Sequence, residues 1–348
     1  MPPALVNGSP EGRLIVEDRG IRIAHMGLGP IGLATYRVLR TRPWAGIIGA
    51  VDIDPRLQGL DIGELSHDGA SGVHIVSAFD EIGPAGSADV VIHCAGSHLD
   101  KGATDQILSA LAWGASVVST CEELSYPWYH HPVAARAIDD AARASGLTVL
   151  ATGVNPGFAM DALALYASGI SERVTGVRVH RAQEAGVRRE PLQRKVGAGI
   201  TPAEFAARKS AGTIGHVGLV ESVAMISRAF GFDVDTIGES LEPAIATQRL
   251  ATQYYTVEPG QVSGIIHKAR GFKNGEELVT LELDMFIGVP DPGDFVTLEG
   301  TPEVKLAVTG LHGDTCTAAI ASNAVPALGH LPKGLVTMLD AAPVRMYR

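Results

Sequence analysis

The chain has 348 residues, of which 46% are hydrophobic and 19% are charged, and its formal net charge is −10 at pH 7. With a pI near 5.6 and no basic block or basic-aromatic stripe, the composition argues against nucleic acid as a partner. No apolar run reaches the ~20 residues of a membrane-spanning helix, so no membrane partner is expected.

Residues 1–20 lack the basic start and apolar centre of a signal peptide, and we expect a short disordered N-terminal lead there. The three cysteines, Cys94, Cys121 and Cys316, lie far apart in apolar surroundings without CxxC spacing. This usage indicates a reduced, cytoplasmic protein with no zinc or other metal site.

The segment 21–54 carries the most informative pattern. An apolar run, Ile21–Met26, leads directly into a GxGxxG turn, which is followed by a helical pattern and by a second apolar run ending at Val51. The turn consists of Gly27, Leu28, Gly29, Pro30, Ile31 and Gly32. Strand, glycine turn, helix and second strand in this order predict a dinucleotide-binding site.

Each glycine has a distinct physical role in such a site. Gly27 lets the chain turn sharply, Gly29 lets the backbone approach a pyrophosphate, and Gly32 lets the helix pack against the strand. Pro30 and Ile31 open the helix, whose free N–H groups and positive dipole end face the phosphates.

An acid ends the second strand, twenty residues after Gly32. This acid, Asp52, can accept hydrogen bonds from an adenosine ribose, which favours NAD over NADP because a 2′-phosphate would meet like charge. Arg56 is close enough in sequence to reach such a phosphate. We therefore expect NAD(P)H as cofactor, with a weak preference for NAD.

Up to Phe158 the chain alternates strands and helices. Strands are expected over 88–94, 115–120 and 147–151, and helices over 100–113 and 132–145. This alternation predicts an α/β fold with a Rossmann, doubly wound parallel sheet over residues 21–158. Ligands of such sheets bind at the carboxyl edge, where the strands place Ala95, Gly96, Ser97, Cys121 and Asn155.

The pattern changes after Phe158. We expect a helix over 160–170, a helical block over 201–230, and strands over 174–182, 251–257, 262–271 and 277–287. Alternating residues in the first of these strands suit a sheet with one exposed face, so residues 159–303 are expected to form an α+β domain for substrate binding or dimerisation. Residues 304–348, with an apolar run and a small-residue helix, are expected to return to the first domain.

Two adjacent acids, Glu122 and Glu123, directly follow a buried strand. A carboxylate beside a nicotinamide can stabilise a cationic nitrogen and move protons during hydride transfer. Adjacent side chains do not easily enter one cleft, so one acid is expected to face the nicotinamide. The alternative interpretation is that these acids cap the following helix.

Other candidates are less specific. His216 lies in an apolar stretch that we expect to be helical, where it either reaches a substrate pocket or is a satisfied core histidine. The charged run 188–195 is expected to be a solvated or partner-facing loop. No Lys or Arg lies at the motif ends, which argues against an α-amino acid substrate, although Arg181 and Lys195 have the reach to enter the cleft.

Several longer motifs together carry a family resemblance. They are the glycine turn, CEELSYPW at 121–128, GVNPGF at 153–158, GHVGLVES at 215–222, VPDPGDFVTLEGTP, and HGDTCTAA at 312–319. With these motifs the chain resembles the 2,4-diaminopentanoate dehydrogenase and native amine dehydrogenase group, which is related to dihydrodipicolinate reductase through its N-terminal domain. The resemblance covers nearly the whole chain from Ile21.

The resemblance implies a homodimer that interconverts a small ketone or aldehyde plus ammonia with a primary amine, using NAD(P)H. It implies that a glutamate of CEEL is the acid/base that binds ammonia and amine: Glu122 first, Glu123 second. It also implies that Phe158 lines the substrate site, and Tyr126 is a further aromatic neighbour. Two alternatives stay open: a dihydrodipicolinate reductase-like reductase of an imine or amino-acid derivative, and a non-catalytic dinucleotide-binding redox sensor.

Overall fold

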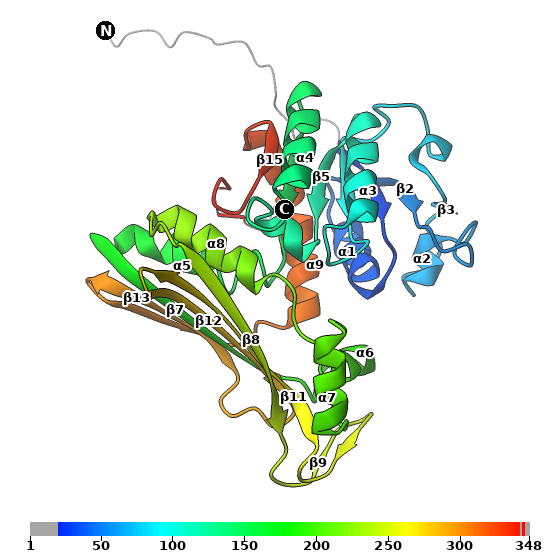
Figure 1. Ribbon diagram of the computed structural model, residues 1–348. Coiled ribbons are helices and arrows are strands. Elements are labelled where there is room, and N and C mark those ends of the chain that lie inside the picture. Colours follow the sequence, from blue (N-terminus) through cyan, green and yellow to red (C-terminus); the bar gives the residue numbers. More distant parts are fainter. Residues whose placement is uncertain (1–19, 342, 345–348) are drawn as a thin grey trace, which may run out of the picture.

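The computed structural model describes residues 20–341, 343 and 344, so the N-terminal lead expected over 1–20 lies, apart from Gly20, outside the described residues. The chain forms two domains (Figure 1). It leaves the first domain after β6 (Thr148–Ala151), forms the second domain, and returns to the first with α9 (Gly313–Ala327) and β15 (Gly334–Val336). Within the described part of the chain, no helix has both the length and the apolar character to cross a membrane.

The first domain is built on a seven-stranded parallel sheet in the order β15-β6-β5-β4-β1-β2-β3. The strands are β1 (Ile21–Met26), β2 (Ala45–Val51), β3 (Ile75–Val76), β4 (Val90–His93), β5 (Ser116–Ser119), β6 (Thr148–Ala151) and β15 (Gly334–Val336). The expected Rossmann sheet is confirmed. Its central strands are buried on both faces, as their continuous apolar runs require.

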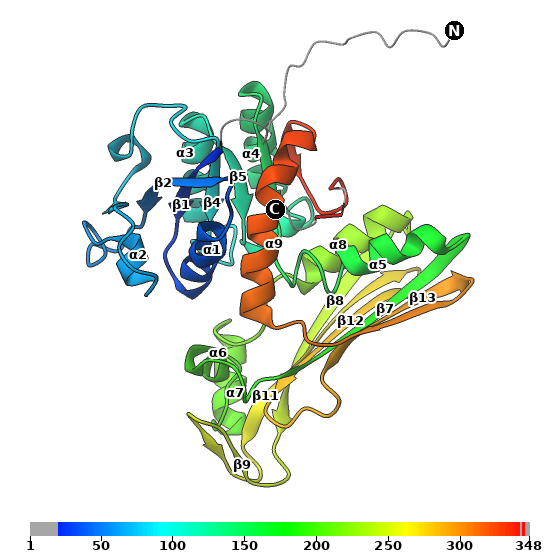
Figure 2. The same cartoon turned by 180° about the vertical axis from the view of Figure 1, so that it is seen from behind.

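Helices cover both faces of this sheet. One face packs against α3 (Lys101–Ala112) and α4 (Pro132–Ala144), and the other against α1 (Pro30–Arg40) and α9 (Gly313–Ala327). A short helix, α2 (Ile62–Leu65), lies near the β3 edge. In Figure 2 the long α9 runs from the second domain into the first and lies beside α1.

The glycine turn has the geometry that its sequence predicts. Gly27 has a φ of +86°, a left-handed conformation that favours glycine. A Cβ added at Gly32 would lie 2.0 Å from the carbonyl oxygen of Gly27, whereas one added at Gly29 would meet nothing within 4 Å. The turn therefore brings the helix close to the strand and leaves open space above Gly29.

The second domain contains a six-stranded mixed sheet in the order β14-β13-β7-β12-β11-β8. The strands are β7 (Arg173–Glu184), β8 (Thr236–Ile245), β11 (Val262–Lys273), β12 (Glu276–Phe286), β13 (Gly293–Thr301) and β14 (Val304–Val308). Only the β7–β12 pair is parallel within this sheet. The helices α5 (Ala162–Ala167) and α8 (Leu219–Phe230) cover one face of it (Figure 1).

The structure corrects several expected elements. The helical block over 201–230 is two helices, α7 (Pro202–Ser210) and α8, separated by a loop in which Gly215 and Gly218 have φ values of +123° and +103°. These left-handed glycines interrupt the helix. Residues 188–195 were expected to be a loop, but most of them form the helix α6 (Glu190–Lys195). Pro191 lies in its first turn, where proline is favoured.

Long-range pairing explains the remaining differences. The strand expected over 251–257 is a pair of short strands, β9 (Leu250–Ala251) and β10 (Thr256–Val257). Strands β8 and β13 were not expected. The segment expected to return to the first domain from residue 304 first forms β14, which pairs with β13, and the return begins with α9.

The contrast between two glycines of the turn gives a stability prediction. Gly32→Ala should destabilise the protein by about 1–3 kcal/mol, because the clashing atom is a backbone carbonyl that has little freedom to move. Gly29→Ala should leave the unfolding temperature unchanged and weaken dinucleotide binding, because its methyl group would fill the space above the turn. Thermal unfolding and cofactor titration measure both effects. Equal melting temperatures for the two variants would contradict this interpretation of the turn.

Candidate functional site

A cleft of about 380 Å³ lies between the two domains at the carboxyl edge of the first sheet. The first domain contributes the start of α1 and the segments after β4, β5 and β6. The second domain contributes β7, α6 and the loop before α8, and the start of α9 completes the lining. Predicted site residues in this lining are Gly29, Pro30, Ile31, Gly96, Ser97, Glu122, Asn155 and His216.

Of the two adjacent acids, Glu122 lines the cleft. It begins a short 3-10 helix, Glu122–Ser125, directly after β5. Burial raises the pKa of its carboxyl group, while hydrogen bonds from its own backbone N–H and from the Ser97 side chain, and the charge of Lys195, act in the opposite direction. An acid with a raised pKa is suited to exchange protons closer to neutral pH than an ordinary glutamate.

The Glu123 carboxylate is held by three contacts within the first domain. It accepts a hydrogen bond of 2.6 Å from the backbone N–H of Leu99 and pairs with His98 Nδ1 at 2.9 Å and His131 Nε2 at 3.0 Å. These contacts join the segments after β4 and β5 to the start of α4. Because its carboxylate is held by these three partners, only Glu122 of the adjacent pair is directed to the cleft.

His216 lies in the loop before α8, and the expectation that it is part of a helix is wrong. Its Nε2 accepts a hydrogen bond of 3.1 Å from the Asn155 amide, and its backbone N–H donates to His267 Nδ1 at 3.2 Å. Burial, followed by the charge of Lys195, lowers the pKa of His216 to about 3, so the ring is neutral. The buried Oδ1 of Asn155 has no partner among the described residues and lies in the cleft wall.

The second domain brings four cations to the cleft, of which sequence reasoning named Arg181 and Lys195 as able to enter it, but not Arg188 and Arg189. Arg181 pairs with the buried Asp294 and donates to the Leu311 carbonyl at 3.1 Å. Arg188 and Arg189 bind Asp314, and Lys195 is on α6. The absence of Lys and Arg at the motif ends therefore does not argue against a substrate carboxylate, because Arg181 and Lys195 both line the cleft. The dense charge of the run 188–195 was the available signal, but its position over the cleft depends on tertiary packing.

Three of the predicted residues outside the cleft lining have side chains that are packed in the protein interior. Phe158 packs in the core between the second sheet and its helices, and Tyr126 packs against the core under α9. The Cys121 side chain is buried, and its thiol donates to the Ser97 carbonyl at 3.3 Å. The sequence motifs place these residues beside the site, but their side chains point into apolar layers.

The remaining cofactor candidates lie around the glycine turn or farther along the sheet edge. Asp52 accepts a hydrogen bond of 2.7 Å from the Leu28 N–H, which fixes its carboxylate beside the turn. Arg56 is 86% exposed and pairs with Asp54 at 2.6 Å. Gly27 and Gly32 shape the turn, and Ala95 is exposed next to the cleft residue Gly96.

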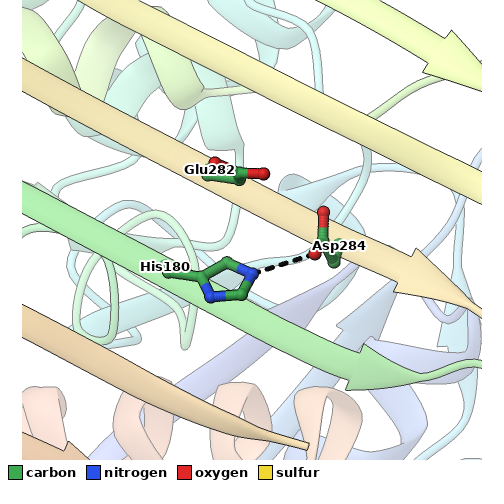
Figure 3. A group of neighbouring side chains, drawn as sticks. All are labelled: His180, Glu282 and Asp284. Atoms are coloured by element: carbon green, nitrogen blue, oxygen red, sulfur yellow. Dashed lines mark hydrogen bonds and ion pairs between the residues drawn. The ribbon is translucent and has the colours of Figure 1, made fainter. Parts of the chain in front are cut away.

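A group with metal-ligating side chains lies elsewhere. His180, Glu282 and Asp284 project from β7 and β12 with ligand atoms within 4.8 Å of one another (Figure 3). His180 Nε2 lies 2.9 Å from Asp284 Oδ2, and Glu282 pairs with Lys268 at 2.7 Å. The lysine already balances one carboxylate, so the group is accounted for as an ion-pair cluster on the sheet.

Comparisons with known proteins agree with the architecture. Residues 158–346 match the 2,4-diaminopentanoate dehydrogenase C-terminal domain. The chain is 30% identical over 334 residues to a 2,4-diaminopentanoate dehydrogenase of Acetoanaerobium sticklandii, covering 92% of this chain and 93% of that protein. It is 25% identical over 338 residues to an amine dehydrogenase of Streptomyces virginiae, covering 91% and 92% of the two chains.

The fold also matches that of a solved amine dehydrogenase from Mycobacterium smegmatis. The TM-score is 0.81 at 23% identity, and the match covers 96% of this chain and 99% of the other. The domain match extends over more than half of the chain, and the relative from Acetoanaerobium sticklandii aligns over nearly all of it. The chain therefore belongs to the 2,4-diaminopentanoate dehydrogenase family of NAD(P)-dependent amine oxidoreductases.

Proposed function

We propose that this chain interconverts a small ketone or aldehyde plus ammonia with the corresponding primary amine, using NAD(P)H, and that Glu122 is the acid/base. The observation that carries the proposal is the position of this half-buried carboxyl group, with its raised pKa, in the same cleft as the glycine turn. Neither a cyclic-imine reductase nor a non-catalytic sensor is favoured by any relative named above.

The residues present fit a dinucleotide. The first turn of α1 has no acidic residue and no capping side chain, so its N–H groups are free of competing side-chain carboxylates. The open space above Gly29 allows close approach of a pyrophosphate, and the unpartnered Oδ1 of Asn155 offers an acceptor for a carboxamide. The nicotinamide, when bound, supplies or accepts the hydride.

The chain's own groups supply binding, orientation and proton transfer. As a carboxylate, Glu122 stabilises a cationic ammonium or iminium nitrogen, and in its protonated form it returns a proton to the carbonyl oxygen that leaves as water. Ser97, which lines the same cleft, favours the ionised form of the carboxyl group and so lowers its pKa against the effect of burial. The neutral His216, held by Asn155, adds no positive charge beside the cationic nitrogen.

A cofactor absorbance assay tests the reaction class. Purified protein is offered NADH or NADPH, concentrated ammonium and a panel of small ketones and aldehydes, and ammonium is omitted as a control. Ammonium-dependent oxidation of the reduced cofactor is expected and identifies the preferred nicotinamide. Oxidation that is equally fast without ammonium would overturn the proposal.

Substitution of the two acids separates their roles. Glu122→Gln should lower kcat by roughly 10²–10⁴-fold with unchanged NAD(P)H binding, because the acid/base is lost and the shape is kept. Glu123→Gln should retain most of the turnover, because its amide oxygen still accepts from Leu99. Steady-state kinetics and cofactor titration measure both variants, and wild-type turnover in Glu122→Gln would exclude this residue as the acid/base.

The raised pKa of Glu122 also predicts how stability changes with pH. A carboxyl group whose pKa is raised by burial contributes stability while it is protonated, and this contribution is lost as pH rises through its folded pKa. Compared with Glu122→Gln, the wild type should therefore lose stability as the pH rises above 4.5, the ordinary pKa of a glutamate, towards the raised pKa of Glu122. Thermal unfolding of both proteins across this range is the measurement, and a constant difference between them would contradict the assignment.

Substitution of Asp52, at the end of β2, tests the preference between NAD and NADP. We propose a preference for NAD, because the Asp52 carboxylate faces the place where a 2′-phosphate would bind and Arg56 is engaged by Asp54. Asp52→Ala should weaken NADH binding by roughly tenfold, corresponding to a lost pair of hydrogen bonds to a charged group, and NADPH binding by less. Arg56→Ala is the matched control and should leave NADH affinity unchanged. Equal losses of NADH and NADPH affinity in Asp52→Ala would contradict the proposed preference for NAD.

We also propose that the protein acts in the cytoplasm as a homodimer with ammonia as co-substrate. The three cysteines are free, which is consistent with a reducing compartment.

A further inference from the structure

Two arginines of the second domain lie at the glycine turn of the first. Arg188 and Arg189 follow β7, and both line the cleft together with Gly29, Pro30 and Ile31. Arg189 also borders a groove between α1 and α9 that Pro30 and Asp314 share. The two guanidinium groups are therefore beside the place where a dinucleotide's pyrophosphate meets the start of α1.

The arginines are held in a built arrangement. Arg188 donates to Asp314 Oδ1 at 2.8 Å and Arg189 to Asp314 Oδ2 at 3.0 Å, so one carboxylate bridges both groups. Gln193 donates to the Arg188 carbonyl at 2.7 Å and fixes the loop. A Cβ added at Gly313 would lie 2.6 Å from a guanidinium nitrogen of Arg188, so the guanidinium rests directly on the start of α9.

The charge of this cluster is incompletely balanced. The Arg188 side chain is only 5% exposed, and its buried Nε has no partner within the described part of the chain. Burial tends to raise the pKa of Asp314, but the charges of Arg188 and Arg189 hold it below its usual range, so Asp314 is a single negative charge between two positive ones. The positive ends of α1 and α9 add to the excess. Such a site requires an anion.

We propose that Arg188 and Arg189 clamp the pyrophosphate of the bound dinucleotide against the first turn of α1, with Asp314 holding the two guanidinium groups in position. This inference rests on the proposed use of NAD(P)H. It makes the cofactor a bridge between the domains, since the glycine turn belongs to the first and the clamp to the second. A substrate carboxylate is the other possible anion, and the experiment separates the two.

The test uses ADP-ribose, which contains the pyrophosphate but no nicotinamide, alongside NADH and adenosine. Arg189→Ala removes a side chain that is 37% exposed, so folding should be preserved, as thermal unfolding will check. The matched control is Arg194→Ala, which removes a charge from the exposed side of α6. Arg188→Lys keeps the charge of the buried position but loses the planar fork.

Calorimetry should show that Arg189→Ala weakens ADP-ribose and NADH by roughly tenfold and that Arg194→Ala weakens neither. Arg188→Lys should weaken both ligands, and adenosine, which has no phosphate, should bind all variants equally in competition. Unchanged ADP-ribose affinity in Arg189→Ala overturns the clamp. A higher KM for the carbonyl substrate with unchanged ADP-ribose binding also overturns the clamp, because it shows that the arginines bind the substrate. If wild-type protein binds neither NADH nor ADP-ribose, the proposed function itself fails.

Discussion

The close approach of α1 to the strand before it is the constraint on which the site depends. Gly32 has no room for a side chain because the Gly27 carbonyl occupies that space, and Gly27 itself needs a left-handed conformation. This packing directs the first turn of α1 at the cleft with its N–H groups free. The parallel register of β1, β4, β5 and β6 then brings Ser97, Glu122 and Asn155 to the same edge.

The adjacent acids illustrate what local sequence can and cannot decide. Both follow a buried strand, and their identity indicates acid/base chemistry with equal force for each. Which acid faces the cleft depends on two partners of Glu123, His98 and His131, which hold its carboxylate. They lie 25 and 8 residues from Glu123 in the sequence. Within the described part of the chain Glu122 makes no such ion pair, and it lines the cleft. A sequence pattern predicts the pair, whereas tertiary contacts assign the roles.

The same division holds across the fold. Apolar runs and the glycine turn were sufficient to predict the parallel sheet, because its buried strands and helices have strong periodicity. The second domain was harder, since half-exposed strands such as β8 depend on pairing partners distant in sequence. Two left-handed glycines, Gly215 and Gly218, lie on either side of His216 and interrupt the helix predicted there. Phe158 and Tyr126 were placed near the site although their rings pack in core layers. Side-chain direction follows packing that local sequence does not encode.

The charge balance of the cleft links the clamp to the proposed chemistry. Its cations are Arg181, Arg188, Arg189 and Lys195, and they are opposed by Asp294, Asp314 and a Glu122 carboxyl group whose raised pKa makes it less completely ionised. The side chains alone therefore give the cleft a net positive charge, which repels an ammonium or iminium nitrogen. A pyrophosphate carries two negative charges and offsets this positive excess. On the proposed reaction, a bound cofactor would therefore remove the repulsion that the cleft otherwise exerts on the cationic nitrogen beside Glu122.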